Sequence, residues 1–528
     1  MRNFELTGRS AAYGADGMAA TSHPRATLAA IDILRSGGNA VDAAVAAIAV
    51  HSVVEPHMTG IGGDCFFIYA PAGGKVVSYN GSGRACAGAK TEWYLDNGIT
   101  EISQDSPHAV TIPGAVEAWS RLVQDHGTKE LGEILETAID LADTGYPVQP
   151  RVAYDWNRFE GKLNSNDSIK RVFLKNGRPY KVGDVFSQPK LANTLREIAK
   201  NGSDGFYKGR IAEEMVSSLN KLGGLHTVED FAGVAGEYCD PISTSYRDHE
   251  VMECPPNGQG FIALMMLNIL EGYNLADLDP NGSERYHLEI ESGRLGFIQR
   301  DLYFDATDQS TNKLDTLLDK GFAANQRQLI NVDKAMPHSA SDLLSAQSDT
   351  VYLTVVDRDA NAVSFINSLF RPFGSGLICD KTGVMFHDRG SLFSIQKGNG
   401  NTIEPGKRPV HTILPGMLLK DNRAVMPFGV MGGQYQPFGH THLLTNVLDY
   451  GLDVQQSLDH PRLFHQNSKV EVEGGIPEDV YTKLELLGHD VIPAPAPHGG
   501  GQAIFIDWDR GVLIGGSDPR KDGCALGY

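Results

Sequence analysis

The sequence lacks a long apolar run, an apolar leader and an excess of basic residues. Its most apolar stretch, residues 40–54, is interrupted by Asp42 and His51, and residues 1–6 hold no apolar core of the kind that secretory signals carry. The 46 lysines and arginines are outnumbered by 65 aspartates and glutamates, which gives a net charge of −19. An acidic surface does not attract nucleic acids or anionic membranes. We therefore expect a cytoplasmic protein with neither kind of partner.

Sequence motifs for metals and cofactors are also missing. The six cysteines include no Cys-x-x-Cys pair, so reduced structural thiols are expected. His440 and His442 would share a face only on a strand and have no third ligand nearby in the sequence. The glycine clusters lack the spacing of a phosphate-binding loop. We expect neither a metal nor a cofactor.

Hydrophobic periodicity predicts a helix-rich first part and a strand-rich second part. Residues 26–35 carry one apolar stripe that ends at Gly37–Gly38, a nearly all-apolar helix follows, and residues 211–222 repeat the stripe before a capping box at 227–230. Strand-like runs are expected in part of 377–386 and at 412–419, 503–507 and 512–515. With 528 residues, 41% of them hydrophobic, the chain can bury a large core, and length alone would suggest several domains.

A β-hairpin is predicted directly after a polar tract at residues 339–348. Residues 351–357 are β-branched and aromatic, 358–361 supply turn residues, and 362–368 form a second strand-like run. If the turn is centred on residues 359 and 360, Thr350 lies opposite Leu369 and Ser368 lies opposite Val351. A hydroxyl is then expected beside Thr350.

Thr350 is a candidate nucleophile because it heads this hairpin. A threonine hydroxyl needs a base, and the least demanding base is its own α-amine, which cleavage of the Asp349–Thr350 bond would free. Such an amine titrates at roughly 7.7 to 8.0 when unperturbed. The alternative is that Thr350 merely begins a strand.

Ordered matches from about Gly17 to Tyr528 resemble the gamma-glutamyltransferase family of N-terminal nucleophile hydrolases. They include the segments 17–20, 37–44, 58–63, 113–116, 206–209, 373–376, 406–409, 431–433 and 516–520. By this resemblance Thr350 falls on the position of the processing threonine and nucleophile.

The resemblance implies self-cleavage into a large subunit, 1–349, and a small subunit, 350–528, that carries the catalytic threonine. Residues 333–349 would be a mobile linker. Together the subunits would form one compact unit of the α+β class, an αββα sandwich of two sheets between helical layers. A homodimer of such heterodimers is left open.

The resemblance also assigns roles to individual residues. Ser368 would orient Thr350, and the Gly432 and Gly433 amides would form the oxyanion hole, where glycine allows close approach. Arg84 would hold a substrate anion. The remaining candidates for substrate binding are His411 and Thr412, which replace a serine pair of the family, and Tyr435, which either lines the cleft or packs beside it.

Several substrate contacts depart from the transferase pattern. Ser82 stands in the arginine position, Phe370 replaces an asparagine, and residues 391–394 hold no carboxylate where the family has Asp-Asp-Phe-Ser. Residues 393–409 are also short for a lid loop. This pattern is similar to the branch that includes oxamate amidohydrolases and acylases, which implies hydrolysis of a small carboxylate-bearing amide. The alternatives are γ-glutamyl hydrolysis or transfer, a cephalosporin- or glutaryl-type acylase, and a non-catalytic binding homologue.

Overall fold

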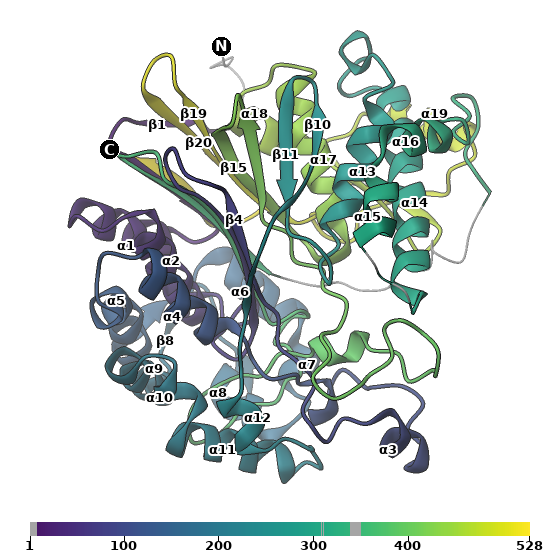
Figure 1. The fold of residues 1–528 in the computed structure, drawn as a ribbon. Helices are drawn as coiled ribbons and strands as arrows, with labels where there is room; N and C mark the ends of the chain where they lie inside the picture. The colour runs from purple at the N-terminus through teal and green to yellow at the C-terminus, as the bar shows by residue number, and fades with distance from the viewer. Residues whose placement is uncertain (1–7, 308, 310, 338–349) are drawn as a thin grey trace.

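In the computed structural model, two seven-stranded sheets are stacked between two layers of helices (Figure 1). The structure describes residues 8–307, 309, 311–337 and 350–528. The predicted αββα sandwich is therefore confirmed. Within the described ranges, no helix combines the length and apolar character needed to cross a bilayer.

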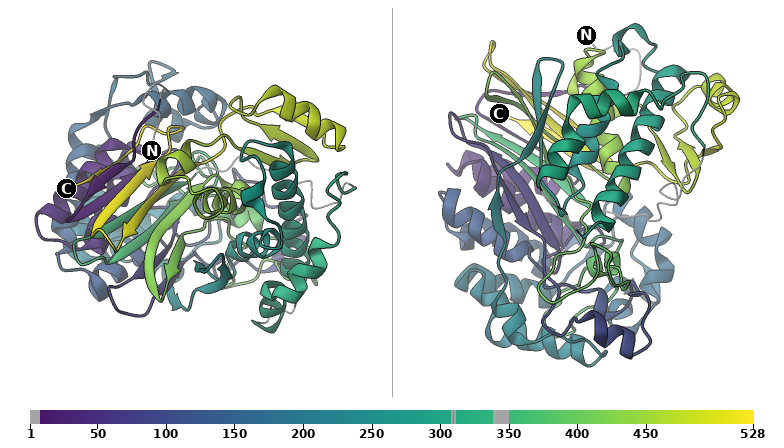
Figure 2. Two further views of the ribbon diagram at one scale, coloured as in Figure 1. Left: turned by 90° about the horizontal axis from the view of Figure 1, so that it is seen from above. Right: turned by 45° about the vertical axis from the view of Figure 1, so that its right-hand side comes forward.

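Strands from both sides of Thr350 pair with one another within each sheet. The first sheet has the spatial order β21 (Cys524–Gly527), β2 (Gly17–Thr21), β12 (Val351–Asp357), β13 (Ala362–Ser368), β3 (Asp64–Ala70), β4 (Val77–Gly81) and β9 (Glu237–Cys239). The second has the order β1 (Ala12–Gly14), β20 (Val512–Ser517), β19 (Gly500–Asp507), β15 (Arg423–Met431), β14 (Gly416–Lys420), β11 (His249–Glu253) and β10 (Ile242–Tyr246). The view from above shows early and late strands side by side (Figure 2). Pieces made by a cut before Thr350 would therefore stay joined by ladder hydrogen bonds in both sheets.

The outer face of each sheet is covered by its own helices. On the first sheet pack α1 (Pro24–Arg35), α2 (Ala40–Val54) and α4 (Ala115–His126), and on the second pack α13 (Gly260–Leu270), α17 (Gln436–Leu448) and α18 (Val454–Asp459). All residues of α2 are buried, because this helix lies between the sheet and α5 (Leu131–Thr144). Asn39 and Asp42 form a capping box at its start.

Most of the predicted elements are confirmed, and two are wrong in extent. Helix α1 ends before Gly37, which has a φ of 90°, α11 spans Gly209–Asn220, and Thr227 begins a capping box. The 377–386 run forms only an isolated bridge between Ile378 and Met385. The run expected at 412–419 becomes a strand only at Gly416, because the Leu414 amide donates to the side chain of Gln436 at 2.8 Å.

The β12–β13 hairpin is confirmed, but its predicted register is wrong by one residue. Val351 pairs with Asn367, not Ser368. The Asp357 carboxylate accepts hydrogen bonds from the amides of Asp359 and Asn361, and Ala360 takes a φ of 63°. The turn is therefore not the two-residue turn centred on residues 359 and 360 that the prediction assumed, and the strands pair one residue out of the predicted register. This shift brings Ser368 across from Thr350.

The first part of the predicted linker packs against α14 (Ser283–Asp305). The Met336 amide donates to Glu291 at 2.8 Å, and Arg294 donates to the Met336 carbonyl at 2.8 Å. The rest of that segment, 338–349, lies outside the described residues, and so does Asp349 of the expected cleavage junction.

Candidate active site

Thr350 lies at the head of β12, where three adjacent strands bring polar side chains into one row. Its Oγ1 is 3.1 Å from Ser368 Oγ at the end of β13, and both residues are buried. Ser368 in turn pairs with Asp64 at the start of β3. The sheet register therefore places the candidate nucleophile, its hydroxyl partner and a carboxylate side by side.

Among the described residues, two nitrogen donors fix the position of the Ser368 hydroxyl. The Phe370 amide donates to Ser368 Oγ at 2.8 Å, and Arg389 Nη2 donates to the same oxygen at 3.4 Å. These two contacts hold the hydroxyl toward Thr350.

Asp64 is a buried carboxylate surrounded by donors. The Gly83 amide donates to Oδ1 at 2.9 Å, and Oδ2 lies 3.2 Å from His411 Nε2 and 3.4 Å from His387 Nδ1. Burial acts to raise the pKa of Asp64, but His387, His411 and Arg389 outweigh it and hold the pKa well below its usual value. Burial and the nearby Arg389 lower the pKa of His411 to about 3, so this ring is neutral at pH 7.

Arg389 was not anticipated from the sequence, although it lies within two hydrogen bonds of the nucleophile. Its side chain is fully buried, and Nη1 donates to Thr412 Oγ1 at 2.9 Å. The guanidinium carbon lies 4.2 Å from the centroid of the Phe370 ring, a cation–π contact. Burial lowers the pKa of Arg389 to about 10, which leaves the group cationic at neutral pH. The only sequence signal was the charged pair 388–389 next to the replaced acidic run.

Gly432 and Gly433 follow β15 in the turn that leads into α17. Their φ angles of 130° and 60° favour glycine, and a Cβ on Gly432 would lie 2.9 Å from Gly499 Cα. Gln259 Nε2 donates to the carbonyls of Gly433 and Thr412, each at 3.2 Å. Since Thr412 also binds Arg389, this glycine turn is linked to the group around Thr350.

Arg84 and Tyr435 do not join that group. Arg84 donates to the Gly406 carbonyl at 3.1 Å and lies 3.8 Å from Glu237, with 45% of its side chain exposed. It lines a separate hollow of about 420 Å³. Tyr435 is buried, and its ring stacks on His498 at 5.3 Å, so in this structure it packs.

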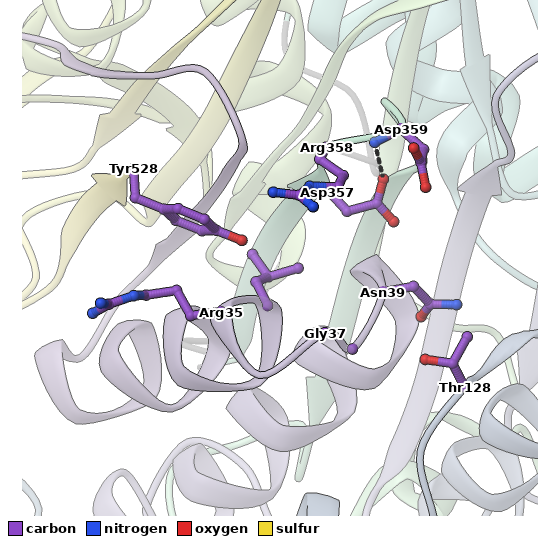
Figure 3. Close-up of a pocket in the computed structure, with 10 residues that line it drawn as sticks. Arg35, Gly37, Asn39, Thr128, Asp357, Arg358, Asp359 and Tyr528 are labelled. Carbon is purple, nitrogen blue, oxygen red and sulfur yellow. Dashed lines mark hydrogen bonds between the residues drawn. The ribbon is translucent and has the colours of Figure 1, made fainter.

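Another hollow, of about 360 Å³, lies at the opposite end of β12 (Figure 3). It is lined by Asp357 and Arg358 of the hairpin turn, by Asn39 and by Tyr528. Seven residues of extended strand span roughly 20 Å, so this hollow is remote from Thr350.

The two histidines considered as metal ligands have separate carboxylate partners. His440 and His442 lie on α17, where His440 pairs with Glu253 at 2.7 Å and His442 pairs with Glu289 at 3.0 Å. The six cysteines are free thiols, as predicted.

Comparison with known proteins gives matches over almost the whole chain. The family model described as gamma-glutamyltranspeptidase matches residues 26–528. The glutathione hydrolase-like YwrD proenzyme of Bacillus subtilis is 36% identical over 97% of this chain and 99% of its own length. The oxamate amidohydrolase proenzyme of Klebsiella pneumoniae is 31% identical over 97% of this chain and 98% of its own. The crystal structure of cephalosporin acylase from Bacillus halodurans superimposes with a TM-score of 0.92 and 36% identity, covering 100% of this chain and 98% of that one.

Proposed function

The chain belongs to the gamma-glutamyltranspeptidase family and is an amidohydrolase with an N-terminal nucleophile fold. We propose that it cleaves the amide of a small carboxylate-bearing substrate. We further propose that Thr350 is the nucleophile and is released by self-cleavage. The observation that carries this assignment is the buried Thr350–Ser368 hydroxyl pair, 3.1 Å apart, at the head of β12.

In the first stage, Thr350 Oγ1 attacks the carbonyl carbon of Asp349. The carbon–nitrogen bond breaks, the nitrogen gains a proton, and an ester links the two subunits until water hydrolyses it. The products are residues 1–349 and residues 350–528. The proenzyme names of the relatives support this stage.

In the second stage, the new α-amine of Thr350 takes the proton of its own hydroxyl. The hydroxyl attacks the substrate amide, the amine product leaves with that proton, and water hydrolyses the acyl ester. Ser368 Oγ accepts hydrogen bonds from the Phe370 amide and from Arg389, and it lies 3.1 Å from Thr350 Oγ1. Ser368 would therefore orient the nucleophile.

The oxyanion of both stages requires donors aimed at the attacked carbonyl. We assign them to the amides of Gly432 and Gly433, in a turn whose Gly433 carbonyl is linked by Gln259 to the Thr412 carbonyl beside Arg389. Losing one such donor typically costs on the order of 10²- to 10³-fold in kcat.

The electrostatics around Thr350 favour an acidic substrate. Among the described residues, the buried Arg389 reaches Thr350 through Ser368, whereas the carboxylates of Asp64 and Asp388 are engaged, the first by His411 and Gly83 and the second by Arg371 at 2.9 Å. A γ-glutamyl substrate would need a carboxylate for its ammonium group.

Hydrolysis of γ-glutamyl amides is the second candidate function, favoured by the likeness to the YwrD protein. Acylase activity of the cephalosporin type is the third, favoured by the likeness to the Bacillus halodurans structure.

The direct test is to assay matured enzyme with oxamate and γ-glutamyl-p-nitroanilide side by side, with Thr350→Ala as the blank. We expect the larger kcat/KM with oxamate and no turnover by the variant. A clear preference for the γ-glutamyl compound would make the second candidate the function. Covalent labelling of Thr350 by an amide-directed probe would exclude a non-catalytic homologue.

A further inference from the structure

We propose that Arg389 binds the substrate carboxylate and thereby selects amides whose carboxylate lies zero to two methylene groups from the scissile carbonyl. The inference rests on the proposed function and specifies its substrate class: monoamides of short dicarboxylic acids. It replaces Arg84 as the expected anchor.

Arg389 has donors left for a ligand. A guanidinium has five N–H groups in a planar fork. Among the described residues, Arg389 spends one from Nη1 on Thr412 and one from Nη2 on Ser368, and its buried Nε has no hydrogen-bond partner. A carboxylate that accepts from such an edge in bidentate fashion would satisfy these groups.

The charge of Arg389 is only partly balanced by its acidic neighbour. Asp64 Oδ2 lies 3.9 Å from Arg389 Nε, beyond hydrogen-bond distance, while the Asp64 oxygens are within 3.2 Å of Gly83 and His411. Arg371 is closer to its own carboxylate, Asp388, at 2.9 Å. Arg389 is therefore the cation near Thr350 that lacks a hydrogen-bonded carboxylate among the described residues.

Phe370 determines how a ligand can approach. Its ring contacts two guanidinium groups, with its centroid 4.2 Å from Arg389 Cζ and 4.5 Å from Arg371 Cζ. The ring is thus in cation–π contact with Arg389, whose Nε has no hydrogen-bond partner among the described residues. In this buried setting a charge-assisted hydrogen bond is stronger than at Arg84, which is half exposed to water.

The distance from Arg389 to the nucleophile limits the length of the acyl chain. Two hydrogen-bond lengths, 3.4 and 3.1 Å, connect Arg389 Nη2 through Ser368 to Thr350 Oγ1. The attacked carbon must lie about 3 to 3.5 Å from Oγ1, and each further carbon adds roughly 1.3 Å of reach. A carboxylate three methylenes away would extend past the guanidinium unless the chain folds back.

The first experiment uses matured wild-type enzyme and the monoamides oxamate, malonamate, succinamate and glutaramate, with the neutral diamide succinamide as a matched control. We expect kcat/KM to fall at least about tenfold between succinamate and glutaramate, and about 10- to 100-fold from succinamate to succinamide. A flat profile across chain length and charge would overturn the proposal.

The second experiment compares Arg389→Lys with Arg84→Lys and with Arg358→Lys, an exposed arginine at the far end of the same hairpin. Arg389→Lys keeps the charge but loses the fork, so KM should rise about tenfold for succinamate and stay unchanged for succinamide. Arg358→Lys should match wild type. A KM increase in Arg84→Lys, with none in Arg389→Lys, would return the role to Arg84.

Failure of the inference can be told apart from failure of the proposed function. If amides are cleaved through Thr350 with no preference for carboxylates, only the role of Arg389 fails. If no amide is cleaved, or if Arg389→Lys does not mature, calorimetric titration of wild-type protein with malonate and glutarate still tests whether Arg389 binds a short dicarboxylate. Tighter binding of malonate supports the anion site, and equal or no binding of both contradicts it.

Discussion

Ser368→Ala tests whether the hydroxyl pair at the head of β12 is catalytic. The change removes the partner of Thr350 Oγ1 at 3.1 Å and the acceptor of the Phe370 amide at 2.8 Å. Leaving the buried Phe370 amide without an acceptor costs about 1–3 kcal/mol of free energy. If transition-state stabilisation falls by a similar amount because the nucleophile is less well oriented, kcat decreases roughly 10- to 100-fold. We expect slower self-cleavage, followed over time on denaturing gels, and a lower kcat in the matured fraction.

Ser368→Thr is the matched control, because it keeps the hydroxyl and adds one methyl group at a fully buried position. The methyl costs about 1–3 kcal/mol of folding free energy through overpacking, but it leaves an oxygen for Thr350 and for Phe370. Thermal unfolding should therefore shift down while kcat stays within about tenfold of wild type. Wild-type maturation and turnover in Ser368→Ala would refute the orienting role.

Three further predictions follow from the geometry and the ionisation of the site. Gly432→Ala should lower kcat by about 10²- to 10³-fold with little change in KM. An alanine is strained at a φ of 130° and its Cβ would clash with Gly499, so the turn that carries the oxyanion donors would shift. A wild-type kcat would refute the assignment. The kcat/KM of matured enzyme should rise with pH through one ionisation near 7.7 to 8.0, as the Thr350 α-amine loses its proton, and a flat profile from pH 6 to 9 would contradict that base. Burial lowers the pKa of His411 to about 3 and that of His498 to about 4, so on acidification these histidines take up protons in the unfolded chain before they do so in the folded protein. The free energy of unfolding, measured in urea, should therefore be highest above pH 6.5 and decrease toward pH 4. An increase over that range would contradict the prediction.

The sequence predicted the hairpin because its signals are local. Alternating β-branched residues and the turn residues at 358–361 are enough to specify two paired strands. The register was wrong because it depends on how the Asp357 carboxylate binds two amides of the turn, a detail that residue type alone does not determine. A shift of one residue decided which side chain faces Thr350.

The role of Arg389 could not be read from the sequence, because it arises from contacts between distant segments. Its partners Ser368 and Thr412 come from the end of β13 and from the segment before β14, and Asp64 comes from β3. For Arg84, the sequence suggested a role that the contacts in the structure do not support. Its neighbours in the sequence match the family, but its side chain contacts Gly406 and Glu237, both far along the chain, and not the group around Thr350.

Intact-mass analysis of the purified wild-type protein and of Thr350→Ala, combined with N-terminal sequencing, tests self-cleavage most directly. Self-cleavage by Thr350 predicts two chains for wild type, residues 1–349 and 350–528, with threonine as the new N-terminus of the smaller chain. The variant should remain a single inactive chain. An uncut wild-type chain that hydrolyses amides at full rate would contradict the assignment.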